Sequence, residues 1–349
     1  MAKHLDFGLD TFGDVMADPQ GRPLTQAQAL RHVVEQGVLA DEAGVDFFAV
    51  GEHHRDDYAI SAPEVVLAAI AARTKRVRLG SAVTVLSSDD PIRVYQRFAT
   101  VDAISQGRAE IILGRGSFTE SFPLFGFDLN DYEKLFSEKL DLFVHLLRQN
   151  GTPEGVTWKG ELRPPLAKQH VYPLPESGTM KTWIGVGGSP ESVVRAASYG
   201  LPMMLAIIGG SASRFKSYAE LYRKAFAQLG TAPQPLGVHS PGYVADTDEA
   251  AKEEFFAAFK ANRDRIGRER GWPAMGRDEF EREVALGSLY LGSPETVAQK
   301  IAQTVKALDL DHFDLKYSAG PLGHDKAMRC IELYGTKVIP RVREILAEG

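Results

Sequence analysis

The chain has 349 residues, 44% of them hydrophobic, which is enough to bury a large core. The formal net charge is −6, and Lys and Arg are dispersed rather than clustered, so nucleic-acid binding is disfavoured. No apolar run approaches the roughly 18 residues of a membrane span, and the first ten residues lack the apolar region of a secretory signal. We therefore expect a cytoplasmic protein without a membrane segment. The single cysteine, Cys330, excludes an intrachain disulfide, and its helical context indicates a buried structural residue.

In chain order, short apolar runs alternate with helical patterns. The expected strands are residues 7–12, 45–50, 77–86, 109–113, 182–186, 202–208, 236–244 and 313–318. Eight alternations with right-handed crossovers predict an α/β fold, a (β/α)8 TIM barrel. A doubly wound sheet is the weaker alternative, because no G-x-G-x-x-G follows the first strand.

Several helices between these strands carry their own start and stop signals. Ser61 and Glu64 have the spacing of a capping box. The pairs Asp90-Pro91, Ser189-Pro190 and Ser293-Pro294 each place an N-cap residue before a proline, and Gly44 and Gly200 are expected helix stops.

Two connections are longer than usual and predict insertions, at about 117–181 after strand four and about 246–311 after strand seven, within a single barrel domain over 1–349. The first contains a helix over 132–148. In the second, residues 267–280 combine Gly, Pro and mixed charge without a period, so we interpret them as a mobile lid at the barrel mouth. A surface excursion without function is the alternative.

The apolar run over 45–50 ends abruptly at Gly51 and is followed by Glu52, His53 and His54. Ligands of parallel α/β folds bind at the carboxyl ends of the strands, so these residues are candidates for chemistry. The alternative is that they are only polar residues at a strand end. Two adjacent histidines cannot both point inward from one extended strand, and no third ligand is evident, so we predict no metal site.

A second constellation suits a phosphate. Gly187 and Gly188 follow strand five and lead through Ser189 to Ser192 at the start of a helix, where backbone N–H groups favour an anion. Arg115, between two glycines after strand four, could pair with the same phosphate. Each signal has a plain structural alternative, a helix cap for the serines and a surface ion pair for the arginine. Together they predict a phosphate-bearing cofactor.

Several segments, taken together, resemble the bacterial luciferase-like monooxygenase family. They are GEHH at 51–54, the stretch over 79–118, GSPES at 188–192, SYGLPM at 198–203 and GSPETVAQKI at 292–301. The resemblance runs in order along nearly the whole chain. It implies a (β/α)8 barrel that binds FMN, or in some branches a deazaflavin, at the carboxyl ends of its strands, usually as a homodimer.

The resemblance assigns roles to individual positions. His53 falls on the family's histidine near the reacting flavin and Arg115 on its phosphate-contacting arginine. Gly188, Ser189 and Ser192 fall on its phosphate loop, Ala82-Val83 on a non-prolyl cis peptide beneath the flavin ring, and Ile207 on a position beside the cofactor. Gly187, from the analysis of the strand end above, completes the expected cofactor contacts.

Three positions depart from the luciferase pattern. Gly114 replaces a cysteine, Asp90 a histidine and Ile207 a tryptophan. These departures argue against light emission and leave the substrate open.

The sequence hypothesis is a monooxygenase that uses reduced FMN, supplied by a separate flavin reductase, and O2 on an unidentified small organic substrate. His53 would act as acid or base, and Phe7, Phe12 and Phe118 would form apolar walls. A deazaflavin-dependent hydride-transfer enzyme and a non-catalytic flavin-binding protein are the alternatives.

Overall fold

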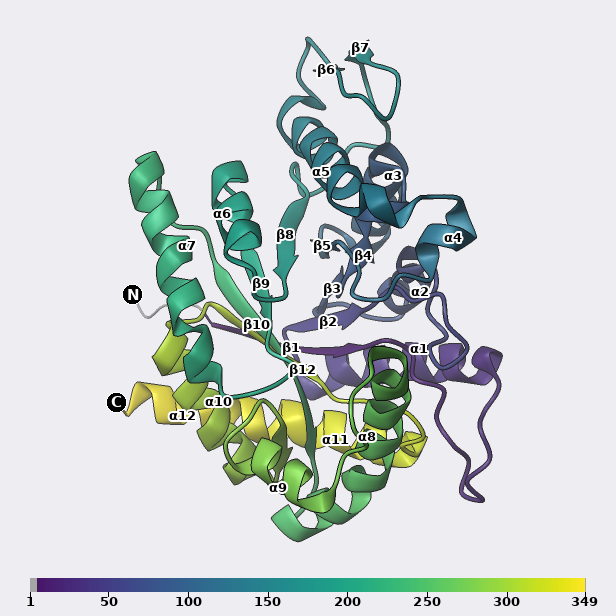
Figure 1. The fold of residues 1–349 in the computed structure, drawn as a ribbon, viewed down its shortest axis with the longest axis vertical. Coiled ribbons are helices and arrows are strands. Elements are labelled where there is room, and N and C mark those ends of the chain that lie inside the picture. Colours follow the sequence, from purple (N-terminus) through teal and green to yellow (C-terminus); the bar gives the residue numbers. More distant parts are fainter. Residues whose placement is uncertain (1–4, 349) are drawn as a thin grey trace.

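Parallel strands close into a barrel in the computed structural model, which describes residues 5–348 (Figure 1). In order around the barrel the strands are β1 (Asp6–Thr11), β2 (Phe47–Val50), β3 (Arg78–Ser81), β5 (Ala109–Gly114), β8 (Lys181–Val186), β9 (Met203–Ala206), β10 (Leu236–Val244) and β12 (His312–Lys316). The barrel closes because β12 pairs with both β10 and β1. The predicted (β/α)8 barrel is confirmed.

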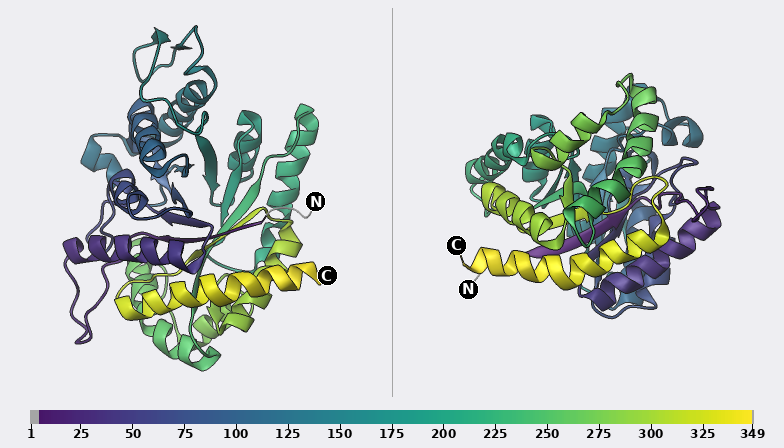
Figure 2. Two further views of the ribbon diagram at one scale, coloured as in Figure 1. Left: turned by 180° about the vertical axis from the view of Figure 1, so that it is seen from behind. Right: turned by 90° about the horizontal axis from the view of Figure 1, so that it is seen from below.

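Helices surround the barrel as the alternation predicted. They are α1 (Gln26–Ala43), α2 (Pro63–Ala71), α3 (Pro91–Ser105), α6 (Pro190–Tyr199), α7 (Lys216–Leu229), α10 (Pro294–Leu308), α11 (His324–Leu333) and α12 (Ile339–Ala347). A π-helical turn, Tyr334–Val338, joins α11 to α12, and the resulting rod lies beside α1 (Figure 2). Within residues 5–348, no helix has both the length and the apolar character that a membrane span requires.

The two long connections lie where they were expected. The first holds α4 (Ser121–Phe125), α5 (Tyr132–Gln149) and a hairpin of β6 (Val156–Trp158) and β7 (Leu166–Gln169), which projects beyond α5 (Figure 1). The second holds α8 (Asp248–Arg270), α9 (Arg277–Ala285) and β11 (Tyr290–Gly292), which pairs with β10. The sequence did not predict β6, β7 or β11, because strands of three or four residues are too short to show a period.

Three of the four predicted N-caps are present: Asp90, Ser189 and Ser293 each accept a hydrogen bond from a backbone N–H of the first turn. The capping box at Ser61 is wrong, because α2 begins after Ala62 without a side-chain cap. Glu64 instead contacts Arg97 at 2.5 Å.

Both predicted helix stops are confirmed, since Gly44 and Gly200 adopt left-handed conformations with φ of 83° and 68°. Cys330 is buried in α11 and accepts a hydrogen bond from the Val244 backbone N–H, as a structural cysteine would. Burial raises its pKa to about 12, so the thiol stays protonated.

The expected strand over 77–86 is interrupted. β3 ends at Ser81, the peptide bond between Ala82 and Val83 is cis, and a short strand, β4 (Thr84–Val85), resumes the pairing with β5. The predicted cis bond is therefore present, and Figure 1 shows both strands beside β5.

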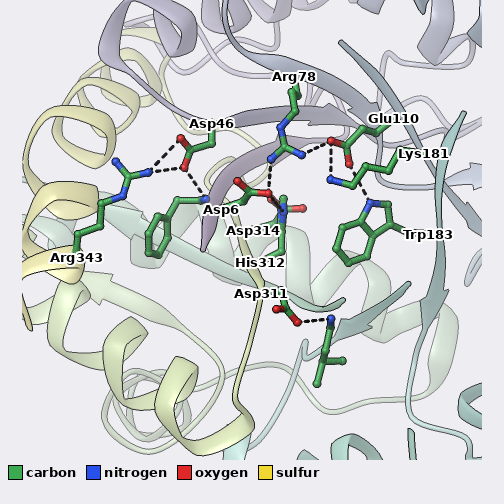
Figure 3. A network of polar contacts seen from close by, with 12 residues as sticks. Asp6, Asp46, Arg78, Glu110, Lys181, Trp183, Asp311, His312, Asp314 and Arg343 are labelled. Carbon is green, nitrogen blue, oxygen red and sulfur yellow. Dashed lines mark hydrogen bonds and ion pairs between the residues drawn. The ribbon is translucent and has the colours of Figure 1, made fainter. Parts of the chain in front are cut away.

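Charged side chains fill the amino-terminal end of the barrel interior (Figure 3). Arg78 lies between the carboxylates of Asp6 and Glu110, and its Nη2 is 2.5 Å from Asp6 Oδ2. Glu110 also accepts hydrogen bonds from Lys181 Nζ at 3.1 Å and Trp183 Nε1 at 2.9 Å. Because Glu110 is buried, this carboxylate depends on its three partners to replace water.

We predict that Glu110→Gln lowers the free energy of unfolding by about 3–5 kcal/mol, the usual cost of removing one partner of a buried ion pair. The neutral amide would leave Lys181 without its carboxylate and Arg78 with only one. Urea denaturation is the measurement, with the exposed Glu176→Gln as control. Equal stability of the two variants would show that the barrel does not depend on this pair.

Candidate functional site

A cavity of about 870 Å³ lies at the carboxyl ends of the barrel strands. Its wall contains the expected residues Glu52, His53, His54, Ala82, Val83, Gly114, Arg115 and Gly187, with Phe12 and Phe118. Ser87 to Asp90 do not reach it, because a 3₁₀ turn (Leu86–Ser88) and the cap of α3 use them. Residues at or after the ends of the barrel strands therefore meet at one cavity.

His53 is enclosed by aromatic rings. Its imidazole lies 4.5 Å from Phe12, 4.7 Å from Tyr58 and 5.0 Å from Phe118, measured between ring centroids. The Nδ1 atom is 3.9 Å from Glu120 Oε1, too far for a hydrogen bond. Burial lowers the pKa of His53, although Glu120 opposes that shift. The imidazole is therefore neutral at pH 7.

His54 has a different environment. Its Nε2 lies 2.9 Å from Glu52 Oε1, and its ring packs edge-on against Phe125. The second oxygen of Glu52 accepts a hydrogen bond from the Val85 backbone N–H at 2.8 Å. His54 therefore helps to tie the loop after β2 to β4, while His53 faces the enclosed part of the cavity.

The cis peptide has space because neighbouring residues lack side chains. A Cβ at Gly114 would lie 2.5 Å from Val83 Cγ2, and one at Gly185 would lie 3.0 Å from Val83 Cγ1. A cysteine at position 114, as in the luciferase pattern, would require Val83 to move. The absence of a side chain at Gly114 therefore leaves room for the side chain of Val83.

Arg115 lines one end of the cavity and reaches the start of α6, whose expected residues Gly188, Ser189 and Ser192 do not themselves line it. Arg115 Nη2 lies 3.4 Å from Ser192 Oγ, and its guanidinium pairs with Glu133. Arg195 contacts the other oxygen of Glu133 at 2.9 Å, while Ser189 caps α6 through the Ser192 N–H. The structural alternative is thus present, because these residues form a helix cap and ion pairs. The phosphate site stays a prediction, with the Arg115 guanidinium and the hydroxyls of Ser189 and Ser192 close together at the N-terminus of α6.

Gly187, the first of the two glycines before α6, faces open space. A Cβ at Gly187 would meet nothing within 4 Å, and Gly188 has a φ of 104°, which favours glycine. With the N–H groups of α6, this arrangement fits a phosphate group.

Two expected wall residues point elsewhere. Ile207 is fully buried in the core between barrel and helices, and Ala206 and Ile208 line the cavity in its place. Phe7 is buried in the same outer core. The predicted side-chain contacts of Ile207 and Phe7 with the site are wrong, because successive side chains of a strand face opposite sides.

The sequence interpretation missed polar residues on the cavity floor. His239 of β10 lies 2.7 Å from Asp10 of β1, and Lys316 of β12 lies 3.1 Å from Asp14. Asp314 also reaches the cavity. The signal was present as alternating polar residues at 314, 316 and 318 of the last expected strand.

The second insertion covers part of the cavity mouth. The lid segment over 267–280 is not one loop, because residues 267–270 end α8, residues 277–280 begin α9, and only 271–276 are irregular. The prediction of an irregular segment is therefore wrong at both ends of 267–280, where the charged residues belong to α8 and α9. Trp272, Pro273 and Met275 of the remaining loop line the cavity.

Ion pairs connect the end of α8 to the loop after β2, and a hydrogen bond connects it to the loop after β5. Arg55 contacts Glu269 at 2.6 Å, Arg265 contacts Asp57 at 3.0 Å, and Arg270 donates to the Ser117 carbonyl at 3.0 Å. These contacts are partly exposed, so each contributes little by itself.

Possible metal ligands gather outside the barrel, where His32 and Glu35 of α1 meet His324 of α11. The two imidazole rings are stacked 3.7 Å apart and within 13° of parallel. A ring nitrogen directs its lone pair in the ring plane, so stacked rings cannot both address one ion. The prediction of no metal site stays a prediction.

Comparison with known proteins gives a consistent result. The family description "Luciferase-like monooxygenase" matches residues 11–311. The alkanal monooxygenase alpha chain of Photorhabdus luminescens is 27% identical over 220 residues, 63% of this chain and 59% of that protein. The chain thus spans about three-fifths of the length of that relative.

Solved structures share the fold. The monooxygenase RslO1 from Streptomyces bottropensis has a TM-score of 0.82 at 22% identity and covers 96% of this chain and 99% of its own. The oxygenating constituent of 3,6-diketocamphane monooxygenase from Pseudomonas putida, in complex with FMN, scores 0.78 at 18% identity, covering 97% and 99%. An F420-dependent secondary alcohol dehydrogenase with an F420-acetone adduct scores 0.75 at 18% identity, with the same coverage. From the match over 11–311, the chain belongs to the luciferase-like monooxygenase family.

Proposed function

We propose that the protein binds reduced FMN at the carboxyl ends of its strands and uses O2 to oxidise a small, largely apolar organic molecule. The observation that carries this proposal is the continuity of one cavity from Arg115, which contacts Ser192 at the start of α6, to the enclosed His53. The relatives named above support it. A separate reductase, a homodimer, a single domain and a cytoplasmic location remain expectations that accompany the proposal.

The residues at the Arg115 end suit the cofactor. Arg115, Ser189, Ser192 and the N–H groups of α6 would hold the phosphate, and Gly187 leaves the backbone accessible. The peptide Ala82-Val83 would lie against the ring system. When bound, reduced flavin would supply the electrons with which O2 is activated.

The chain's own contribution at the other end is enclosure and proton transfer. Phe12, Tyr58 and Phe118 keep water from the imidazole of His53. Because that imidazole is neutral, it can accept a proton, and the resulting cation would face Glu120. His53 is thus proposed as the base.

The test is to load the protein with FMN, reduce it, mix it with O2 and follow absorbance with and without candidate substrates. Substrate-dependent reoxidation that places one atom of ¹⁸O₂ in the product is expected. Anaerobic turnover with reduced deazaflavin alone would identify the hydride-transfer alternative, which the shared fold of the F420-dependent dehydrogenase keeps open. Tight binding of oxidised flavin without turnover would identify a binding protein.

We predict that Arg115→Ala weakens FMN binding by about 1.5–3 kcal/mol, the range for hydrogen bonds to a charged group, and leaves riboflavin binding nearly unchanged. Isothermal titration with both ligands gives the difference. The exposed Arg93→Ala serves as control. An equal loss for both ligands would mean that Arg115 only supports the barrel.

We predict that His53→Ala keeps FMN affinity but lowers substrate oxidation by roughly 10²–10⁴-fold, the usual contribution of a positioned acid or base. His54→Ala should reduce stability more than rate, because His54 braces Glu52. Single-turnover oxidation and thermal unfolding of both variants are the measurements. Wild-type rates in the His53 variant would remove its proposed role.

We predict that proteases cleave the ligand-free protein within 267–280, at the irregular residues 271–276, and that bound flavin with substrate slows the cleavage. Limited proteolysis with mass spectrometry of the fragments checks this. If saturating ligand leaves the cleavage rate unchanged, the loop is a passive cover.

A further inference from the structure

A histidine and a carboxylate form a pair on the cavity floor that the proposed function does not use. His239 Nδ1 lies 2.7 Å from Asp10 Oδ2, and Asp10 has no exposed surface. His239 keeps 12% of its side chain exposed and lines the cavity. Its other ring nitrogen, Nε2, has no hydrogen-bond partner among residues 5–348. One nitrogen is therefore anchored while the other is available to a ligand.

The charged groups near Asp10 and His239 have hydrogen-bond partners of their own. The neighbouring carboxylate, Asp314, is bonded to His312 Nε2 at 2.6 Å. The neighbouring cation, Lys316, lies 3.1 Å from Asp14 and donates to the Ser318 carbonyl at 2.5 Å. No other group among the described residues bonds to the Asp10 side chain.

The protonation of His239 follows from these contacts. Burial by itself would lower the pKa of His239, but the carboxylates of Asp10 and Asp314 outweigh burial and the repulsion from Lys316, and the net shift is upward. The cationic form thus persists above the ordinary value of about 6.5 and is lost as pH rises through the raised pKa.

The second imidazole of the cavity has the opposite tendency. Phe12 lies between the two histidines, 4.5 Å from the His53 ring and 6.3 Å from the His239 ring. Burial lowers the pKa of His53, which has no carboxylate within hydrogen-bonding distance. Two titratable groups whose environments separate their pKa values are a common basis of acid and base roles in one site.

We propose that His239 is the proton donor of this cavity, presenting Nε2–H to an oxygen atom of the organic ligand, and that Asp10 is its positioning residue. The ligand would carry a carbonyl or hydroxyl oxygen on an otherwise apolar body. In the step, the Nε2–H bond breaks and an O–H bond forms on the ligand. The electron pair stays on the ring, which becomes neutral imidazole and keeps its Nδ1–H on Asp10. The chemical step rests on the proposed function, whereas the charge of His239 does not.

A purely structural role is the alternative to be separated. In the barrel β12 lies between β1 and β10, so the pair also spans the interior across an intervening strand. If the His239–Asp10 pair were purely structural, it would contribute only to the stability of the barrel. If His239 is a proton donor, its imidazole must also be doubly protonated, and its Nε2 signal must shift when an oxygen-bearing ligand binds.

The first measurement uses ¹⁵N NMR of the imidazoles in the flavin-free protein, with His239→Gln to assign the signal. We expect His239 to be doubly protonated at pH 7 and to titrate above its ordinary range. Asp10→Asn should move that titration to lower pH, and Asp10→Glu should restore it in part. A neutral His239 in the wild type at pH 7 would overturn the proposal.

The second measurement adds acetophenone, a neutral aromatic ketone, to the same sample. We expect the His239 Nε2 signal to shift as the carbonyl accepts its hydrogen bond. His170→Asn is the control, because His170 is exposed and does not line the cavity. That variant should preserve the shift. An unmoved His239 signal, at concentrations that shift the signals of Phe118 and Tyr58, would overturn the donor role.

The third measurement is the pH profile of substrate oxidation by the FMN-loaded enzyme. Asp10→Asn should move the alkaline limb of kcat/KM to lower pH, and His239→Gln should lower kcat by roughly 10²-fold or more while FMN affinity is retained. An unchanged alkaline limb in Asp10→Asn would overturn the positioning role. Because both NMR measurements need no flavin, a failure of the proposed FMN chemistry would leave their result intact.

Discussion

Paired charges inside the barrel are the constraint on which the rest of this structure depends. Five carboxylates and five basic side chains face one another there: Asp6, Asp10, Asp14, Glu110 and Asp314, with Arg78, Lys181, His239, His312 and Lys316. Buried ions are tolerated only with partners, so each strand that carries one of these groups must enter the barrel in one register. A slip of one residue would turn these groups into the apolar layer beneath the helices.

Small residues make this interior possible. A Cβ at Gly8 would lie 1.8 Å from Asp314 Oδ1, and one at Gly80 would lie 2.5 Å from the Phe47 ring. The same principle acts at the carboxyl end, where Gly114 and Gly185 give Val83 its place. Glycine therefore appears in the barrel where a neighbouring charge, ring or cis peptide needs the volume.

The paired charges have different roles at the two ends of the barrel. At the amino-terminal end the ion pairs of Glu110 and Arg78 stabilise the closed sheet (Figure 3). At the carboxyl end some of the paired side chains line a cavity, where a ligand can contact them. There Arg115 and the imidazoles of His53 and His239 line one continuous cavity. The proposed oxidation and the proposed proton donor both follow from that arrangement.

The barrel could be predicted from the sequence because its signals are local. Apolar runs, Pro- and Ser-based caps and Gly stops each act within a few residues, and the rule that ligands bind at the carboxyl ends of strands placed His53, Arg115 and Gly187 at one cavity. The same rule could not fix which side chain of a strand faces inward, because an error of one residue in a strand's alternation reverses its faces. Ile207 and Phe7 were misplaced for that reason.

The sequence alone thus determined the architecture, the strand ends that carry the site and the likeness of its motifs to one family. Only the tertiary structure decided the charges on the cavity floor. Asp10 and His239 are 229 residues apart, and their contact exists only because the barrel closes through β12. Local patterns carry no information about such a pair, since its energy depends on burial and on the neighbouring charges that closure brings together.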